Sequence, residues 1–325
     1  MTPEPEPGPS GLVHELMLTG AEDDVVAAVT PFVLDALAVG DRVVLCLSPQ
    51  PGDILRDLFE TTSGVTFLPY DPERRRANAD LMMFRRIAED SRAAGTRVRA
   101  VNEIPPALYL DWYQWRRYEA AVNVVLADFD IWGVCVYDRH ALSAEMEHDL
   151  HATHPVTGQG LRCEVNRRYQ DPLGFARTHF DAPPDPVERT APAVDLADPS
   201  PAAARAAVRA FAGHHAGLAD EDVEGLVFAV NEVVTNALVH GCPPVRMRLW
   251  AAPNRIVATV TDSGLGPADP FVGMVPSPSG FGMWFSQQLV DVVHRRSGGG
   301  YTVRLSAARN GYGSLGPQRA PEEGR

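Results

Sequence analysis

The sequence predicts an α/β protein of two domains, with a mostly parallel sheet in the first and an α/β sandwich in the second. Its 325 residues match the length of about two domains. In the first half, short apolar runs alternate with longer helical patterns. A proline-rich stretch poor in large apolar residues, 181–201, then interrupts the pattern and reads as an extended linker. We therefore predict domains at 11–180 and 202–309, with disordered tails at 1–10 and 310–325.

The N-terminal domain is predicted to consist of strand–helix units. Apolar runs predict strands at 13–18, 42–47, 65–68, 97–101 and 131–137. Helical patterns fall between and after them, at 23–38, 53–61, 79–94, 107–126 and 144–151. This alternation implies βαβ connections and therefore a mostly parallel sheet.

The C-terminal domain has a different order of elements. Two helices come first, at 202–214 and 220–239, and the second opens with an acidic first turn after Asp220. Strands at 245–251 and 255–262, a helix near 283–290 and a strand at 301–305 follow. The order predicts helices that cover one face of a mixed sheet.

The charge and lysine content exclude several classes of protein. With 42 acidic and 29 basic residues, the net charge of −13 argues against direct binding of nucleic acid, which uses a basic face. The sequence contains no lysine, so all 29 basic residues are arginines. A Walker A loop, a protein-kinase fold and Schiff-base chemistry each need a lysine and are excluded.

Cysteine spacing and hydropathy indicate the cellular compartment of the protein. The four cysteines form no CxxC pair, which argues against a disulfide framework or a zinc finger. No apolar run approaches the roughly 20 residues of a membrane span. The acidic, proline-rich start is unlike a signal peptide. We expect a cytoplasmic protein without membrane contact.

The helix 226–240 combines many apolar residues with a polar stripe. Glu232, Asn236 and His240 are spaced four residues apart, so they line one face of the helix. A carboxylate and a carboxamide one turn apart can hold a hydrated magnesium ion and orient a phosphate or a water. Taken without other motifs, Glu232, Asn236 and His240 have an alternative interpretation, namely that they form the solvent-exposed edge of the helix.

Two glycine-rich segments follow this helix. In the first, Asp262 leaves an apolar strand and is followed by Gly264 and Gly266. An acid in that place can accept a hydrogen bond from the amine of a base, and the glycines let the backbone approach a ligand. The second, with Gly280 and Gly282, opens a helix, where unpaired N–H groups favour phosphate.

Together, the run Asn231–His240, the DSGLG segment and the GFGMW segment resemble the GHKL (histidine-kinase-type) ATPase domain, most closely the anti-sigma factor/serine kinases of bacterial partner switching. The resemblance implies ATP and Mg²⁺ as cofactors. It also implies that Asn236 binds magnesium, Glu232 polarises the attacking hydroxyl or water, and Asp262 reads adenine. The remaining residues implied to shape the lid and the phosphate pocket are Gly264, Gly266, Gly280, Gly282 and Met283.

The same resemblance implies that the protein captures a sigma factor and phosphorylates serine or threonine on an anti-anti-sigma (STAS-type) partner. It also implies a homodimer, as in relatives. The lid 267–279 contains no basic residue, so we expect weak kinase activity, with Arg295 or a partner's arginine supplying charge. One alternative is a sensor histidine kinase, although His214 and His215 follow a single short helix rather than a two-helix hairpin. The other is a non-catalytic, nucleotide-dependent binding module.

The N-terminal domain carries a second resemblance. The run from Val101 to Asn123, followed by Val134–Asp138 and Thr153–Pro155, looks like the MEDS sensory domain, a RecA-like module. Without lysine, a RecA-like sheet has no working Walker A loop. The resemblance therefore implies that this domain senses a small ligand or partner and does not hydrolyse ATP.

Three polar residues are the candidates for a sensory pocket: Glu103, Glu119 and Asn123. Glu119 and Asn123 lie one turn apart on a helix rich in aromatic side chains, which would form the pocket walls. The alternative is an amphipathic helix whose aromatic residues pack on the sheet. Cys46 and Cys135 are expected to be buried. A thiol- or metal-based sensor built from Cys135, His154 and Cys163 is a further hypothesis.

Overall fold

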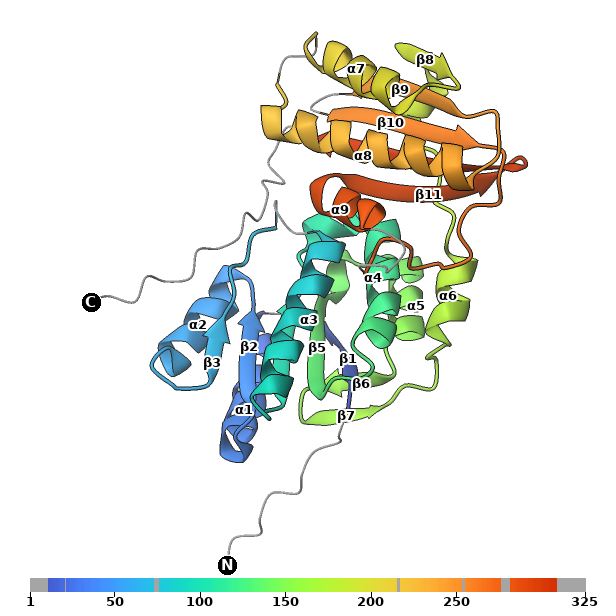
Figure 1. Ribbon diagram of the computed structural model, residues 1–325. Helices are drawn as coiled ribbons and strands as arrows, with labels where there is room; N and C mark the ends of the chain where they lie inside the picture. The colour runs from blue at the N-terminus through green and yellow to red at the C-terminus, as the bar shows by residue number, and fades with distance from the viewer. Residues whose placement is uncertain are drawn as a thin grey trace, which may run out of the picture. The chain divides into compact units, whose positions relative to one another are not determined.

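The computed structural model describes residues 11–20, 22–72, 76–214, 217–252, 255–275 and 281–308. The chain divides into two compact units, Met1–Phe180 and Asp181–Arg325, and each is built around its own sheet (Figure 1). The predicted tails at 1–10 and 310–325 lie outside the described residues, as does Gly280. Among the helices of the described residues, none combines the length and apolar character needed to cross a membrane.

The first unit contains a seven-stranded sheet in the order β3-β2-β4-β5-β1-β6-β7. Its strands are β1 (Val13–Thr19), β2 (Arg42–Cys46), β3 (Val65–Phe67), β4 (Val98–Glu103), β5 (Ile131–Asp138), β6 (Val156–Gln159) and β7 (Arg162–Val165). Neighbouring strands pair in parallel, except that β6 and β7 form an antiparallel hairpin. The predicted α/β class with a mostly parallel sheet is confirmed.

Helices cover both faces of this sheet (Figure 1). Their bounds are α1 (Glu22–Val39), α2 (Pro49–Phe59), α3 (Ala77–Ala93), α4 (Trp112–Val125), α5 (Ala144–Thr153) and α6 (Pro172–Thr178), with short 3₁₀ turns η1 (Pro106–Asp111) and η2 (Arg139–Ala141). Helices α1 and α2 pack on one face, and α3 to α5 lie on the other.

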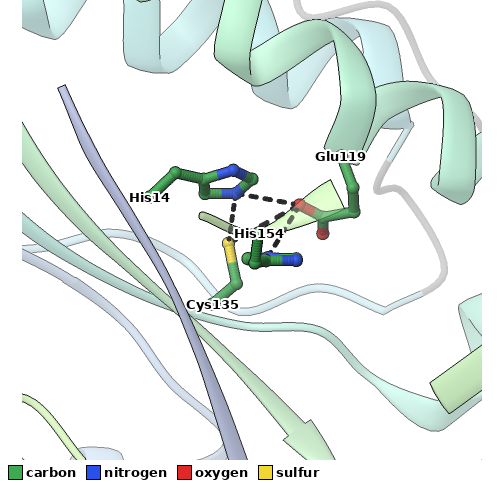
Figure 2. Close-up of side chains that lie close together, drawn as sticks. All are labelled: His14, Glu119, Cys135 and His154. Carbon is green, nitrogen blue, oxygen red and sulfur yellow. Dashed lines mark hydrogen bonds and ion pairs between the residues drawn. The ribbon is translucent and has the colours of Figure 1, made fainter. Parts of the chain in front are cut away.

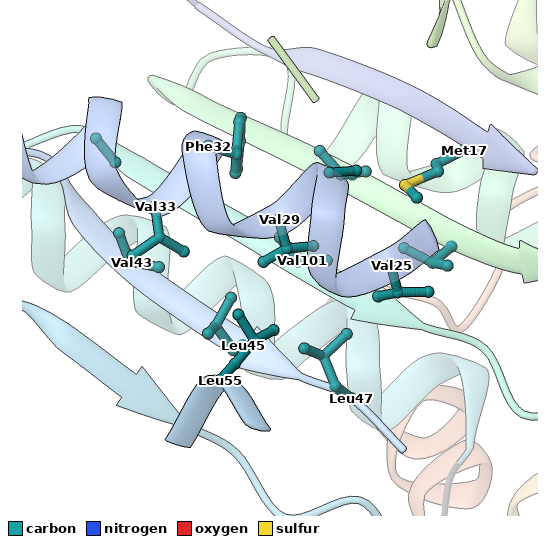
Figure 3. Packing of buried hydrophobic residues seen from close by; sticks show 14 of the residues in the cluster. Met17, Val25, Val29, Phe32, Val33, Val43, Leu45, Leu47, Leu55 and Val101 are labelled. Carbon is teal, nitrogen blue, oxygen red and sulfur yellow. The ribbon is translucent and has the colours of Figure 1, made fainter. Parts of the chain in front are cut away.

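Side-chain alternation along β1 divides the two faces. Val13 and Met17 point to the apolar core under α1, where they meet Val29 and Phe32 (Figure 3). His14 points the opposite way, toward α4. Each fully buried side chain of this core contributes about 1.5–3 kcal/mol to folding. The core therefore fixes the register that places His14 on the α4 face.

The second unit is a sheet with helices on one face (Figure 1). The strand order is β11-β12-β10-β9-β8, and all of these neighbours pair antiparallel, which corrects the expected mixed sheet. Its elements are η3 (Pro186–Arg189), β8 (Val194–Ala197), α7 (Pro201–Ala212), α8 (Asp220–His240), β9 (Arg246–Ala252), β10 (Arg255–Asp262), α9 (Gly282–Leu289), β11 (Asp291–Ser297) and β12 (Gly300–Ala308). β9 and β10, like β11 and β12, are separated by only two residues, which is too few for the crossover that parallel pairing requires.

The prediction of an extended linker at 181–201 is wrong. This segment contains η3 and the edge strand β8, whose Val194 pairs with Leu249 of β9. The prolines do not break the strand because they lie outside it. Pro192 precedes β8 and Pro199 follows it, while Pro201 starts α7, where its missing N–H costs nothing. The second unit therefore begins at Asp181.

Candidate functional site

Helix α8 supplies the first two residues of the predicted nucleotide site. Its acidic first turn complements the helix dipole, and one face is buried against the sheet through residues such as Val230 and Val234. Glu232 and Asn236 are half-buried beside that face. Within the described part of the chain, the Asn236 carboxamide has no hydrogen-bond partner. It is thus available to a ligand.

The Glu232 carboxylate is held in place from both sides. Asn231 Nδ2 donates a hydrogen bond to Glu232 Oε1 over 3.0 Å, and Arg205 of α7 donates in turn to Asn231 Oδ1. The other oxygen, Oε2, faces the start of α9, where a β-carbon on Gly282 would lie only 2.0 Å away. Sequence reasoning did not assign Asn231 and Arg205 to the site. The only signal was an asparagine directly before the glutamate.

Asp262 ends β10 and is 5% exposed. Its Oδ1 accepts hydrogen bonds from the backbone N–H of Gly264 at 2.7 Å and of Cys242 at 3.2 Å. No described residue bonds Oδ2. A β-carbon on Gly264 would lie 2.6 Å from Oδ1, and one on Gly241 2.7 Å, so glycine is required at both positions. The carboxylate is fixed by one oxygen, and the other can accept a hydrogen bond.

The segment that leads from Asp262 into the lid is anchored to the sheet. Gly266 has φ +70°, and a β-carbon there would lie 2.4 Å from the Tyr301 ring. Arg296 donates to the carbonyl oxygens of Leu265 at 3.1 Å and Pro267 at 2.7 Å. This stretch of backbone is therefore held against the sheet.

A turn further along the lid is tied to α9. Gln287 Nε2 donates to Val272 O over 3.0 Å, and Gly273 turns with φ +78°. Met283 packs beneath the turn, because a β-carbon on Gly273 would lie 2.6 Å from its Cγ. α8 packs on both β10 and α9, so that Glu232 lies against Gly282 of α9 and Asp262 of β10 lies against Gly241, which follows α8. The roles of the predicted site residues toward nucleotide stay predictions.

In the first unit, Glu119 and Asn123 of α4 meet His14 of β1. His14 Nε2 lies 3.1 Å from Glu119 Oε2, and His14 Nδ1 lies 3.2 Å from Asn123 Oδ1. Cys135 and His154 reach the same place (Figure 2). His14 was not predicted to belong to a site. Its signal was a polar residue inside an otherwise apolar strand.

Two other predicted residues lie apart from this cluster. Glu103 ends β4, and its carboxylate accepts the backbone N–H of Ser48 over 2.7 Å. Cys163 lies exposed on β7. Cys46 and Cys135 are buried as expected. The aromatic residues of α4 also pack in the interior, which favours the packing interpretation over pocket walls: Trp112, Trp115 and Tyr118.

The buried cluster shifts two pKa values. Burial lowers the pKa of His14, the charge of His154 lowers it further, and Glu119 partly opposes this. Burial would raise the pKa of Glu119, but the charges and hydrogen bonds of His154 and His14 hold it well below its usual range. Glu119 is therefore a fully buried carboxylate that keeps its charge.

Each of the two units matches the model of a known protein family. Residues 13–155 match the MEDS family model, described as the methanogen/methylotroph, DcmR sensory domain. Residues 196–307 match the model of the histidine kinase-like ATPase domain. The chain joins a MEDS domain to a histidine kinase-like ATPase domain.

No curated protein matches the chain. Among solved structures, it is similar to a KaiC-like protein from the hyperthermophilic archaeon Pyrococcus horikoshii OT3, with 14% identity and a TM-score of 0.34. The similar region covers 46% of this chain and 70% of the archaeal chain.

The residues of the ATPase domain fit ATP and Mg²⁺. The Asn236 carboxamide, which makes no hydrogen bond among the described residues, offers an oxygen of the kind that Mg²⁺ accepts alongside phosphates. Asp262 Oδ2 can accept the exocyclic amine of adenine while Oδ1 stays bound to the backbone. The glycines around both carboxylates leave the space that side chains would fill.

Arg295 of the ATPase domain is not available to a phosphate, contrary to expectation. Its Nη2 pairs with Glu188 Oε2 at 2.8 Å, and Arg304 lies 3.5 Å from the other oxygen. Burial would raise the pKa of Glu188, but hydrogen bonds from Arg295 and from the Asp185 N–H, with the charges of Arg295 and Arg304, hold it below its ordinary value. The arginine anchors η3 to the sheet.

Proposed function

We propose that this chain is an ATP-dependent regulator of the anti-sigma type. Its ATPase domain binds Mg-ATP, captures a sigma factor, and transfers phosphate to serine or threonine on an anti-anti-sigma partner. The MEDS domain controls this activity. The observation that carries the proposal is that α8, which bears Glu232 and Asn236, packs on both β10 and α9: Glu232 lies against Gly282 at the start of α9, and Asp262 of β10 lies against Gly241 at the end of α8.

Each residue has a separate task in this proposal. Asp262 Oδ2 accepts the amine of adenine and selects the base. The Asn236 side chain provides an oxygen ligand to magnesium, which supplies positive charge at the phosphates when bound. Glu232, oriented by Asn231, accepts the proton of the partner's hydroxyl as a general base, a role that contributes about 10²–10⁴-fold to rate.

Exposed aromatic side chains support a protein partner. Phe228 of α8 and Phe285 of α9 form an edge-on pair with centroids 6.2 Å apart, yet they are 37% and 47% exposed. Phe281 is 56% exposed beside them. Exposed apolar patches of this kind favour binding of another protein.

A second candidate function is that of a binding module, in which the bound nucleotide sets the conformation of the protein and no phosphate is transferred. The lid 267–279 carries no basic residue, and Arg295 is paired with Glu188. Phosphoryl transfer depends on positive charge around the migrating group. These two facts favour capture of a partner over fast transfer.

Two measurements separate these functions. The first is calorimetry of the full chain with ATP or ADP, with and without Mg²⁺; absence of nucleotide binding would contradict the whole proposal. The second is incubation with labelled ATP and cytoplasmic extract, followed by acid and base treatment. Acid-stable phosphoserine on a second protein supports the kinase, binding without transfer supports the module, and acid-labile label on the chain itself supports a histidine kinase.

The role of the MEDS domain is tested by removing it. A fragment of residues 181–325 keeps every element of the second unit, including η3 and β8. We expect it to bind Mg-ATP like the full chain but to lose the response of partner capture to cell conditions. An unchanged response would contradict sensory control.

A further inference from the structure

Four buried side chains of the MEDS domain converge on one point (Figure 2). They come from four elements: His14 from β1, Glu119 from α4, Cys135 from β5, and His154 from the residue after α5. One nitrogen, oxygen or sulfur atom of each lies within 4.8 Å of all the others. None of the four side chains is more than 5% exposed.

Four of the six separations between these atoms are close to those of a tetrahedral coordination shell, and all six are within 4.8 Å. Bonds of 2.0–2.1 Å to nitrogen or oxygen and 2.3 Å to sulfur give ligand separations of about 3.3 Å and about 3.6 Å. Glu119 Oε2 lies 3.1 Å from His14 Nε2 and 3.3 Å from His154 Nε2. Cys135 Sγ lies 3.5 Å from His14 Nε2 and 3.8 Å from Glu119 Oε2.

The surroundings of His14 fix which of its nitrogens carries hydrogen. Asn123 Nδ2 donates to the carbonyls of Glu119 and Thr153, so Asn123 Oδ1 is an acceptor. His14 Nδ1–H therefore donates to Asn123, which leaves a lone pair on Nε2. That lone pair points at the carboxylate oxygen of Glu119 and the sulfur of Cys135.

His154 is arranged in the same way. Its Nδ1–H donates to the carbonyl oxygen of Leu150 over 2.8 Å, which leaves the lone pair on Nε2. This Nε2 is buried without a hydrogen-bond partner, 3.3 Å from Glu119 Oε2. An imidazole held through Nδ1–H to an oxygen, with Nε2 free, is the usual state of a metal-ligating histidine.

Glu119 also presents a single carboxylate oxygen to the cluster as a possible ligand. Tyr137 donates its hydroxyl hydrogen to Oε1, so Oε2 alone faces the two histidines. When both imidazoles are neutral, two nitrogen lone pairs and a carboxylate oxygen, all acceptors, thus point at each other in the protein interior. Acceptors buried together in this way need a cation between them.

We propose that the MEDS domain binds one divalent transition-metal ion of the zinc class through His14, Glu119, Cys135 and His154. The thiolate and the carboxylate neutralise the ion, so the buried site carries no net charge. Sulfur and imidazole ligands exclude Mg²⁺ and Ca²⁺, which prefer oxygen. Four protein ligands leave no open position, so the ion has a structural or sensory role and no catalytic one.

A metal ion at this site would hold together the elements on the α4 face of the MEDS sheet. The ion links β1, β5, α4 and the end of α5, which are separated by up to 140 residues of sequence (154 − 14). Because the ligands are buried, the ion enters as the domain folds. This inference does not depend on the nucleotide site.

The first test uses the tag-free full chain under reducing conditions. We expect metal analysis to find about one zinc-class ion per chain. After removal with a chelator, titration with Co²⁺ should give the intense visible bands of a tetrahedral ion and a thiolate-to-cobalt band in the near ultraviolet. A chain that binds no metal, or cobalt spectra without a thiolate band, overturns the proposal.

Variants assign the ligands. Cys135→Ser should remove the thiolate band, whereas Cys163→Ser on exposed β7 and Cys46→Ser in buried β2 should keep it. Loss of the band in Cys163→Ser and its persistence in Cys135→Ser would overturn the assignment. Because Cys135→Ser can unfold the domain, Asn123→Ala gives a milder test that keeps all four ligands. It removes the partner of His14 Nδ1, together with the hydrogen bonds that Asn123 donates to the carbonyls of Glu119 and Thr153, and should weaken Co²⁺ binding about 10–100-fold. Unchanged affinity in Asn123→Ala would contradict the tautomer argument.

Discussion

The carboxylate of Glu232 lies against the backbone of Gly282, so closely that a β-carbon on Gly282 would be 2.0 Å from Oε2. Replacing Gly282 with alanine must therefore displace the carboxylate. Because the displaced group is the flexible end of a side chain, the cost to folding should be small. We expect Gly282→Ala to fold normally and to lose about 100-fold or more of any phosphate transfer.

The matched control is Gly213→Ala, at the end of α7. There the nearest atom, Arg209 O, would lie an acceptable 3.4 Å from the new β-carbon. Thermal unfolding and transfer of labelled phosphate check both variants. Full transfer activity in Gly282→Ala would show that Glu232 does not act from this position.

Asp262 should decide which base the ATPase domain binds. In Asp262→Asn, the amide oxygen can still accept the N–H groups of Gly264 and Cys242, so the backbone stays in place. The amide NH₂ then faces the adenine amine, and two donors oppose each other. We expect affinity for ATP to fall by about 1–3 kcal/mol, roughly 5- to 150-fold.

Calorimetry with ATP measures this loss, and Asp269→Asn is its control. Among the described residues, Asp269 Oδ1 accepts a hydrogen bond from the N–H of Phe271 in the lid turn and from no other group. Equal losses in the two variants would mean that the effect is one of general charge and not of base recognition.

The Glu188 ion pair should make the second unit sensitive to acid. The pKa of Glu188 is lowered in the folded protein below its ordinary value of 4.5, so ionised Glu188 stabilises the fold above that pH. The stabilisation is lost as the pH falls through the folded pKa. We expect Glu188→Gln to cost about 1–3 kcal/mol at pH 7 and progressively less as the pH falls below 4.5.

Denaturant unfolding of both proteins across this pH range measures the difference. Glu224→Gln is the control, because Glu224 makes the same two-fold contact to an arginine, Arg209, on the open surface. Exposed pairs of this kind contribute little. A difference for Glu188→Gln that stays constant down to pH 3 would contradict the assigned linkage.

The sequence predicted the elements that carry the candidate nucleotide residues better than the sheet edges. Glu232, Asn236 and Asp262 could be placed because each lies on an element with a strong pattern, namely α8 or β10. Strand β8 was missed because its sequence, Val194–Ala197, is short, half exposed and flanked by prolines. Its stability comes from pairing with β9 and from Asp195–Arg246 contacts, which no local pattern encodes.

The metal cluster was beyond sequence reasoning for a related reason. Cys135 and His154 could be suspected by residue type, but Cys163 was grouped with them and His14 was left out. Strand pairing decides which side chains meet. β1 lies next to β5, so Leu16 pairs with Cys135, and His14, two residues before Leu16, lies on the same face of the sheet as Cys135. Cys163 lies on the antiparallel hairpin at the sheet edge. Such neighbours come from topology and not from spacing along the chain.

The last prediction is that transfer of phosphate by the isolated chain is slow. Three arginines that could supply positive charge are engaged elsewhere: Arg295 pairs with Glu188, Arg296 binds lid carbonyls, and Arg205 reaches Glu232 only through Asn231. The lid itself adds none. We expect single-turnover transfer well below the usual kinase range of about 1–100 s⁻¹.

Glu232→Ala should abolish the remaining transfer and leave Mg-ATP binding unchanged, because Glu232 contacts Asn231 and Gly282 rather than the adenine-reading Asp262. Glu188→Gln then gives an internal check, since it releases Arg295 from its strongest partner. If released charge helps, transfer should rise while Glu232→Ala in the same background stays inactive. A wild-type rate within the usual kinase range would show that the chain finds its positive charge in another way.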